Sequence, residues 1–125
     1  MSPPGACYPG RAAIDAYGNG GFRFAGMSHR GSILMLPSGI YAWSPTRSEE
    51  ISLQSLEPAL AEAGELDLLL LGSGPSLVPP APALRSGFAE RGLALEAMDT
   101  GAACRTYNVL LAEARKVAAA LIAVA

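Results

Sequence analysis

The stretch MDTGAACRTYNVL, residues 98–110, sets the architecture expected of this chain. It closes an apolar run of strand length, Leu93–Met98, and Thr100 then opens a pattern of apolar residues at helical spacing that continues to about Ala114. Asp99 and Thr100 stand where a side-chain oxygen can accept hydrogen bonds from the first amides of a helix. The stretch therefore predicts a buried strand that leads directly into an amphipathic helix.

Apolar runs and helical patterns alternate on both sides of this stretch. Leu66–Leu71 (LDLLLL) and Val117–Val124 are apolar runs typical of strands that are buried on both faces. Ala83–Arg91 has helical spacing, and Gly92 follows it as a stop. Strand, helix, strand, helix and strand with short connections predict right-handed crossovers and a partly parallel sheet that is covered on both faces.

The first part of the chain carries strand and turn patterns instead. Phe22 and Phe24 alternate with Arg23, which places both rings on one face of a strand and Arg23 on the other. The glycine-rich segment 18–21 before them predicts a turn. The other strands expected here are Ile14–Tyr17 and a β-hairpin of Gly31–Leu36 with Ile40–Trp43.

One helix and the domain boundaries complete the expected organisation. A helix is expected to begin near Glu57 with Pro58 in its first turn, and Gly64 is its expected end. Residues 1–12, rich in proline, glycine and alanine, predict a flexible lead-in, and residues 13–125 predict a single α/β domain.

Composition argues against several classes of function. The net charge of −2 and the scattered basic residues argue against a nucleic-acid-binding protein. The two cysteines form neither a disulfide framework nor a zinc-binding spacing. No secretory signal is evident, and the longest apolar stretch is roughly half of what a membrane-spanning helix needs. We expect a cytoplasmic protein that is at most peripheral at the inner membrane, and a charged fraction of only 16% favours a partner or self-association face.

A glycine-containing loop follows the first buried strand of the second half. Gly72, Ser73 and Gly74 stand where open α/β sheets place ligands. Leu77 occupies the position of the third glycine of a dinucleotide-binding loop, and the chain has no Gly-Lys-Ser/Thr sequence of a phosphate-binding loop. A turn-forming role is favoured, and a ligand-cradling role is the alternative.

Cys104 is the most tempting candidate for chemistry. The positive end of a helix dipole lowers the pKa of a thiol, and Cys104 lies in the first turns of the expected helix. A phosphatase-like Cys-x5-Arg loop would need arginine where Leu110 stands. A Cys–His pair would need His29, the only histidine, which is expected as a hydrogen-bonded residue of a turn between strands. A buried, unreactive thiol is therefore favoured, and no metal site is expected.

Several polar residues flank the start of the same helix. Arg105 and Asn108 lie one turn apart beside the apolar stripe, and capping and surface hydrogen bonds explain them. A small anion site that combines the helix start with Arg105 and Arg85 is the alternative. No catalytic set and no cofactor site assemble from these residues. The candidate binding surface consists of Gly72, Ser73, Gly74, Arg85, Asp99, Thr100, Gly101, Cys104, Arg105 and Asn108.

Five segments together resemble a known family: GFRF at 21–24, HRGS at 29–32, LPSG at 36–39, DLLLLGSG at 67–74 and MDTGAACRTYNVL at 98–110. They are similar to a domain-of-unknown-function family shared by bacteria, archaea and mitochondria, which includes the third alpha-subcomplex assembly factor of mitochondrial complex I. The resemblance implies a three-layer α/β fold with a central mixed sheet, and it supplies no catalytic residue or cofactor. It also implies protein partners, and in mitochondrial members an association with the inner membrane.

Two hypotheses about function follow. The first is a non-catalytic protein-interaction module that aids the assembly of a respiratory complex or the biogenesis of membrane proteins. The alternative is a small enzyme or binder of small molecules or anions that uses the loop of Gly72–Gly74 and the helix start at Thr100–Arg105. Self-association as a homodimer is compatible with both.

Overall fold

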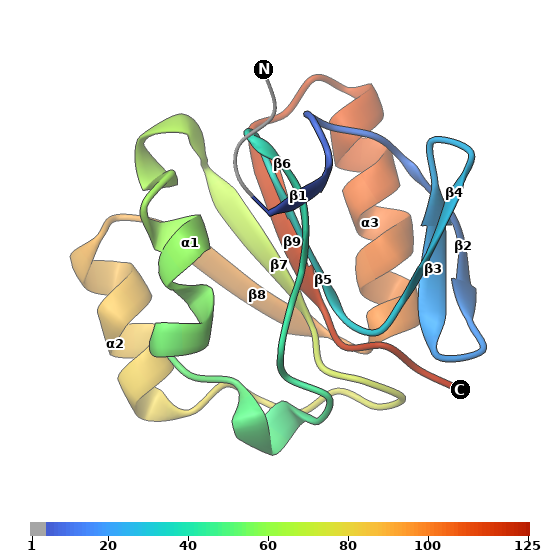
Figure 1. Cartoon of the computed structure of the whole chain (residues 1–125). Helices are drawn as coiled ribbons and strands as arrows, with labels where there is room; N and C mark the ends of the chain where they lie inside the picture. Colours follow the sequence, from blue (N-terminus) through green and yellow to red (C-terminus); the bar gives the residue numbers. More distant parts are fainter. Residues whose placement is uncertain (1–4) are drawn as a thin grey trace.

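The computed structural model describes residues 5–125 (Figure 1). In chain order the strands are β1 (Ala6–Tyr8), β2 (Ile14–Gly18), β3 (Gly21–Phe24), β4 (Met27–Arg30), β5 (Ile33–Leu36), β6 (Gly39–Ala42), β7 (Leu68–Gly72), β8 (Ala94–Met98) and β9 (Val117–Leu121). The helices are α1 (Glu57–Leu60), α2 (Pro82–Glu90) and α3 (Thr100–Ala112), with short 3-10 turns at Ser48–Glu50, Gln54–Leu56 and Ala63–Glu65.

Two sheets form the framework. The larger has six strands in the order β1-β6-β5-β9-β7-β8, and the smaller has three in the order β2-β3-β4. β7 pairs in parallel with β8 and with β9, whereas β5 is antiparallel to β9 and to β6. The large sheet is therefore mixed, as expected. Its parallel part is the β-α-β-α-β unit predicted from residues 66–124.

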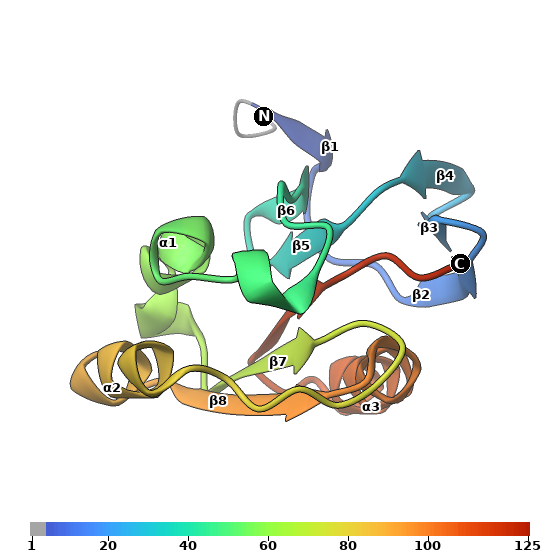
Figure 2. The same ribbon diagram turned by 90° about the horizontal axis from the view of Figure 1, so that it is seen from below.

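The side chains of β7 show how the layers are arranged. Leu69 and Leu71 belong to one buried cluster and Leu70 belongs to the other, because successive side chains of a strand point to opposite faces. α1 and α2 cover the first face through residues such as Leu60 and Phe88, and α3 covers the second together with the small sheet (Figures 1 and 2). The result is the expected three-layer α/β fold.

The strand that joins the parallel part of the large sheet to its antiparallel part has unusually small side chains. β9 reads Val-Ala-Ala-Ala-Leu, and all five residues are buried, with Ala118, Ala119 and Ala120 fully so. Ala118 and Ala120 face the cluster with α1 and α2, and Ala119 faces the cluster with α3. Methyl side chains leave room on both faces for the bulkier residues of the neighbouring layers.

Most predicted elements are confirmed. The predicted placement of His29 in a turn is wrong. It lies in β4, paired with Phe22 of β3, and not in a turn. The hairpin between β3 and β4 turns through Ala25 and Gly26 at φ +50° and φ +74°. Asparagine or glycine is the usual residue at the first of these positions, so a turn with alanine there is not predicted from the sequence.

Two other segments differ from expectation. The helix that begins at Glu57 ends at Leu60, and the 3-10 turn Ala63–Glu65 replaces its last turn. Residues 6–8 of the expected lead-in form β1, which pairs with β6, and residues 1–4 lie outside the described part of the chain. Within residues 5–125, no helix combines the length and the apolar character that crossing a membrane requires.

Candidate functional site

The loop after β7 is closed by contacts within the chain. The Ser73 amide donates to the Met98 carbonyl (2.8 Å). The single hydrogen of the Ser73 hydroxyl is shared between the carbonyls of Ser76 (2.7 Å) and Met98 (3.0 Å), and the hydroxyl oxygen accepts from the Val78 amide (2.9 Å). Ser73 is 4% exposed. Its polar atoms therefore hold the loop in shape and do not point toward solvent.

Thr100 joins this loop to the end of β9. Its side chain is fully buried, and its hydroxyl donates to the Ile122 carbonyl (2.7 Å) while accepting from the Gly74 amide (3.0 Å). Its own amide donates to the Gly74 carbonyl (2.8 Å). One threonine thus satisfies polar groups on two connections at the carboxyl ends of β7 and β9.

Two glycines in this region are required by close packing. A Cβ atom at Gly72 would lie 2.9 Å from Leu121 Cδ2 and 3.1 Å from the Thr100 Cα. A Cβ atom at Gly101 would lie 2.5 Å from the Tyr17 hydroxyl oxygen. Both glycines therefore allow neighbouring layers to approach α3, which is a packing role.

The first amides of α3 are capped, as predicted from Asp99. The Asp99 carboxylate accepts from the Ala102 amide (2.9 Å), and the Asp99 carbonyl accepts from the Ala103 amide (3.0 Å). Together with the Thr100 amide, these groups take up most of the donors that an anion at this helix start would need.

Cys104 has the environment of an unreactive thiol. It is 2% exposed and belongs to the core cluster beneath α3. Burial is the main cause that raises the pKa of the Cys104 thiol to about 12; the Asp99 carboxylate also raises it, and Arg105 lowers it. The thiol is protonated at neutral pH, and a protonated thiol is a poor nucleophile.

A shallow groove separates β2 from α3. It has a volume of about 330 Å³, and Cys104, Arg105 and Asn108 line it from the helix. The Arg105 guanidinium donates to the Tyr17 hydroxyl across it (3.1 Å). The Asn108 side chain bonds to the main chain of Ile14, with its oxygen accepting from the amide and its nitrogen donating to the carbonyl (both 2.8 Å). The polar residues of this part of α3 therefore hold β2 in place.

The structure brings together nine of the ten residues in the candidate surface. Gly72, Ser73 and Gly74 lie beside the start of α3, and the residues from Asp99 to Asn108 follow along that helix. Arg85 is the exception. It is exposed on α2, whose buried residues belong to the cluster on the opposite face of the large sheet from α3.

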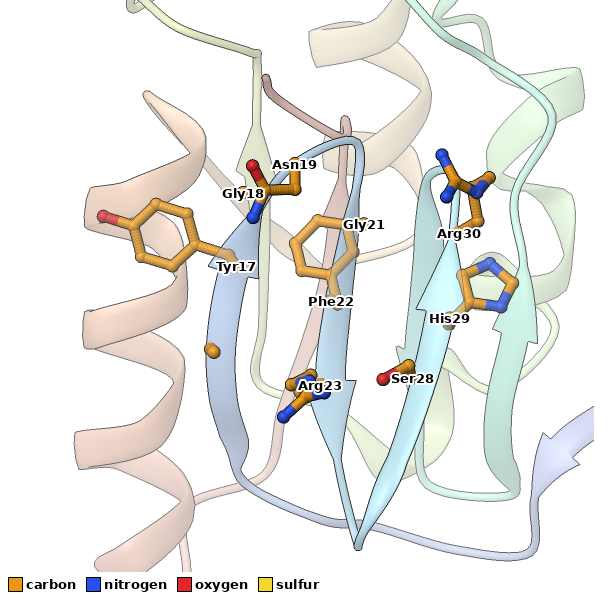
Figure 3. A pocket seen from close by; sticks show the side chains of 10 residues that line it. Tyr17, Gly18, Asn19, Gly21, Phe22, Arg23, Ser28, His29 and Arg30 are labelled. Atoms are coloured by element: carbon orange, nitrogen blue, oxygen red, sulfur yellow. The ribbon is translucent and has the colours of Figure 1, made fainter.

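A larger depression lies on the small sheet, where the sequence did not indicate a site (Figure 3). We call it the β2–β4 hollow; its volume is about 400 Å³. Its lining side chains include Tyr17, Phe22, Arg23, Ser28, His29 and Arg30. Tyr17 points from β2 toward α3, and the other five project from β3 and β4 (Figure 3).

The β2–β4 hollow is cationic in a protein of negative net charge. Arg23 and Arg30 line it, none of its lining residues carries a carboxylate, and neither arginine forms an ion pair within residues 5–125. Arg23 pairs across the strands with Ser28, so it is a diagonal neighbour of Arg30 on the same face. The alternation of Phe22, Arg23 and Phe24 in the sequence indicated the exposed face on which Arg23 lies. The position of Arg30 could not be predicted, because the turn before β4 has no recognisable sequence pattern.

A metal site has no support in the part of the chain that is described. No group of three or more His, Cys, Asp or Glu side chains gathers there in a way that could hold a metal ion. His29 contacts Cys7 and not Cys104, with 3.8 Å between the Cys7 Sγ and the His29 Nδ1.

Known proteins resemble this chain over most of its length. It is 37% identical over 122 residues to an uncharacterized protein of Rhodobacter capsulatus, covering 98% of this chain and 93% of that one. It is 31% identical over 109 residues to NADH dehydrogenase [ubiquinone] 1 alpha subcomplex assembly factor 3 of Xenopus tropicalis, covering 87% of this chain. The match spans 60% of that assembly factor.

A crystal structure and a family model agree with these matches. The structure, described as that of an outer membrane protein from Bartonella henselae, superposes with a TM-score of 0.91 at 50% sequence identity, covering 94% of this chain and 99% of that one. The model of a family described as "Protein of unknown function (DUF498/DUF598)" matches residues 14–122. The chain therefore belongs to this DUF498/DUF598 family.

Proposed function

We propose that this chain is a non-catalytic, protein-binding module that takes part in the assembly of larger protein complexes. The observation that carries the proposal is its similarity to the complex I assembly factors, which extends over 87% of the chain. The burial of Cys104 and the internal hydrogen bonds of Thr100 and Asp99 support it, because they leave the start of α3 without a free nucleophile or an open set of donors.

The β2–β4 hollow is the surface we propose for the partner. Two arginines that form no ion pair within residues 5–125, in a chain of net charge −2, favour a partner segment that carries carboxylates. Tyr17, 42% exposed beside them, supplies an aromatic surface of the kind that is enriched at protein interfaces. The proposed partner is therefore a protein with an acidic segment, either a subunit of a respiratory complex or another membrane protein under assembly.

A charge-reversal experiment tests this proposal. Tagged protein is expressed in its own cells at native level, extracted in mild detergent, and its bound proteins are identified by mass spectrometry. The variant R23E/R30E is compared with R115E/K116E, a matched double reversal in the exposed connection between α3 and β9. We expect a defined set of subunits to be recovered with the unsubstituted chain and with R115E/K116E, and to be lost from R23E/R30E.

Two results would oppose the proposal. Recovery of the chain without any bound protein in every preparation would contradict the proposed protein-binding function. Equal recovery of the same subunits with R23E/R30E and R115E/K116E would keep the function and reject the hollow as the docking surface. Circular dichroism of both variants verifies that they are folded.

The alternative of a small-molecule or anion site at Gly72–Gly74 and Thr100–Arg105 is less favoured. The amides of Gly74, Thr100 and Ala102 already have partners within the chain. A ligand there would have to displace those contacts, each of which contributes to the stability of the fold.

A further inference from the structure

We propose that Cys7 and His29 form a reactive thiol–imidazole pair, in which His29 acts as the base that activates Cys7 toward disulfides. The pair joins β1 to β4, two strands of different sheets. It is separate from Cys104, the thiol that its position at a helix start made the obvious candidate.

The hydrogen bonds of His29 determine which nitrogen faces the thiol. The His29 Nε2 lies 3.3 Å from the Ser32 carbonyl oxygen. A carbonyl only accepts, so Nε2 carries the proton and Nδ1 has a free lone pair in the neutral ring. That lone pair points at the Cys7 Sγ, 3.8 Å away, and can accept the thiol proton. The Ser32 carbonyl is itself fixed, because the Trp43 amide donates to it (2.9 Å).

The backbone of β1 directs Cys7 toward this nitrogen. Ala6 and Tyr8 pair with the adjacent residues Tyr41 and Ile40 of β6, so Cys7 between them is the extra residue of a β-bulge. Bulges redirect side chains, and they are common beside active sites. The Tyr8 ring packs edge-on against Phe24 of the small sheet, with 6.5 Å between ring centroids, and this contact holds β1 next to the strands that carry His29.

The surroundings of the pair separate Cys7 from the arginines of the β2–β4 hollow. His29 alternates with Ser28 and Arg30 along β4, so its ring lies on the face of Phe22, opposite Arg23 and Arg30. His29 is therefore the group that faces the thiol from β4, and the other titratable groups on β1 and β6 are the Tyr8 and Tyr41 hydroxyls. Cys7 is half-buried, which leaves it open to small reagents, whereas Cys104 is enclosed.

The proposed step is thiol–disulfide exchange. His29 Nδ1 takes the proton of Cys7, and the Cys7 sulfur attacks one sulfur of a disulfide, either a low-molecular-weight disulfide or one in another protein. A new bond forms between Cys7 and that sulfur as the original S–S bond breaks. The leaving thiolate takes the proton back from the imidazolium, so the products are a mixed disulfide and one free thiol.

The test measures the rate at which Cys7 reacts with oxidised glutathione, and mass spectrometry of proteolytic peptides distinguishes it from Cys104. A synthetic peptide of residues 5–10 provides the unassisted reference, and H29Q removes the base. The ratio of the rate at pH 7 to the rate at pH 9.5 is compared among the three, because this ratio cancels differences in access to the sulfur.

We expect the ratio for the unsubstituted protein to exceed those of H29Q and the peptide by about tenfold, which is less than the roughly 100-fold or more that general-base assistance typically contributes. Ratios that agree within twofold between the unsubstituted protein and the peptide would overturn the proposal, whether or not H29Q folds. A ratio that stays high in folded H29Q would overturn the role of His29 as the base.

Discussion

The side chain of Asn108 binds the main chain of Ile14 as a neighbouring strand would. Its oxygen accepts from the Ile14 amide and its nitrogen donates to the Ile14 carbonyl, each over 2.8 Å, and 94 residues of chain separate the two. β2 pairs with β3 along one edge, and Asn108 satisfies the first residue of the other edge. The contact fixes the small sheet, and with it the β2–β4 hollow, relative to α3.

Replacing Asn108 with alanine should therefore loosen the attachment of the small sheet. The change removes both hydrogen bonds and leaves the polar groups of Ile14 half-buried without partners, so the free energy of unfolding should fall by about 1–3 kcal/mol. Urea denaturation measures this loss. The control V109A changes a side chain that is 57% exposed and should alter stability by less than about 0.5 kcal/mol. Equal stability of N108A and V109A would show that the contact contributes nothing.

Thr100 offers a test of the hydroxyl alone. Valine has nearly the same shape as threonine, so T100V removes one oxygen and leaves the Gly74 amide and the Ile122 carbonyl without their partner in the core. We expect a loss of roughly 2 kcal/mol or more in the free energy of unfolding, because buried polar groups without partners are costly. T100S retains the hydroxyl and should lose less than T100V. The reverse order would mean that the threonine methyl, and not its hydrogen bonds, stabilises this junction.

Gly72 tests the close approach of β7 and α3. An added methyl group would meet Leu121 Cδ2 at 2.9 Å and the Thr100 backbone at 3.1 Å, so G72A should lower the free energy of unfolding by about 1–3 kcal/mol through overpacking. G64A is the matched control, since a Cβ there has no described neighbour within 4 Å. Thermal and urea unfolding of the two variants should differ clearly. If G72A is as stable as G64A, β7 and α3 can move apart with little loss in the free energy of unfolding.

The second half of the fold was predictable because each element shows its own pattern. The apolar runs LDLLLL and VAAALIAV are typical of buried strands. The capping residue Asp99 directly precedes the first residue of α3. Asp99 and Thr100 were recognised as helix-start residues for this reason. Their hydrogen bonds to the loop of Gly72–Gly74 could not be foreseen, because they depend on how the strands are ordered in the sheet.

The part that could not be predicted depends on contacts between distant segments. β4 reads Met-Ser-His-Arg, and its preceding turn contains Ala25 at positive φ, so neither propensity nor turn chemistry indicates it. Cys7 and His29 are 22 residues apart and meet only because β1 adds to the edge of the large sheet. Asn108 looked like a surface residue for the same reason, because the strand it binds lies at the other end of the chain.

Alkaline pH should weaken the fold through Cys104. The pKa of this thiol is raised to about 12 by burial in the folded protein, whereas an exposed thiol of the unfolded chain has its ordinary value of 9.0. Below pH 9 the thiol is neutral in both states, and this source of stability is fully present. As the pH rises further the unfolded chain ionises first, so the free energy of unfolding falls until the folded thiol also ionises near pH 12.

Urea denaturation between pH 8 and pH 11 measures this effect. We expect the unsubstituted protein to lose up to about 2.6 kcal/mol over this range from Cys104, because one ionising group changes the free energy of unfolding by at most about 1.4 kcal/mol for each pH unit. Tyr107, whose pKa burial raises to about 12, adds to the loss only above pH 10. C104A removes the thiol and should therefore show a shallower decline between pH 9 and pH 10, even if the lost packing lowers its stability at pH 8. Parallel declines in the two proteins would mean that water reaches Cys104 in the folded state, and the assignment of this thiol as unreactive would then be wrong.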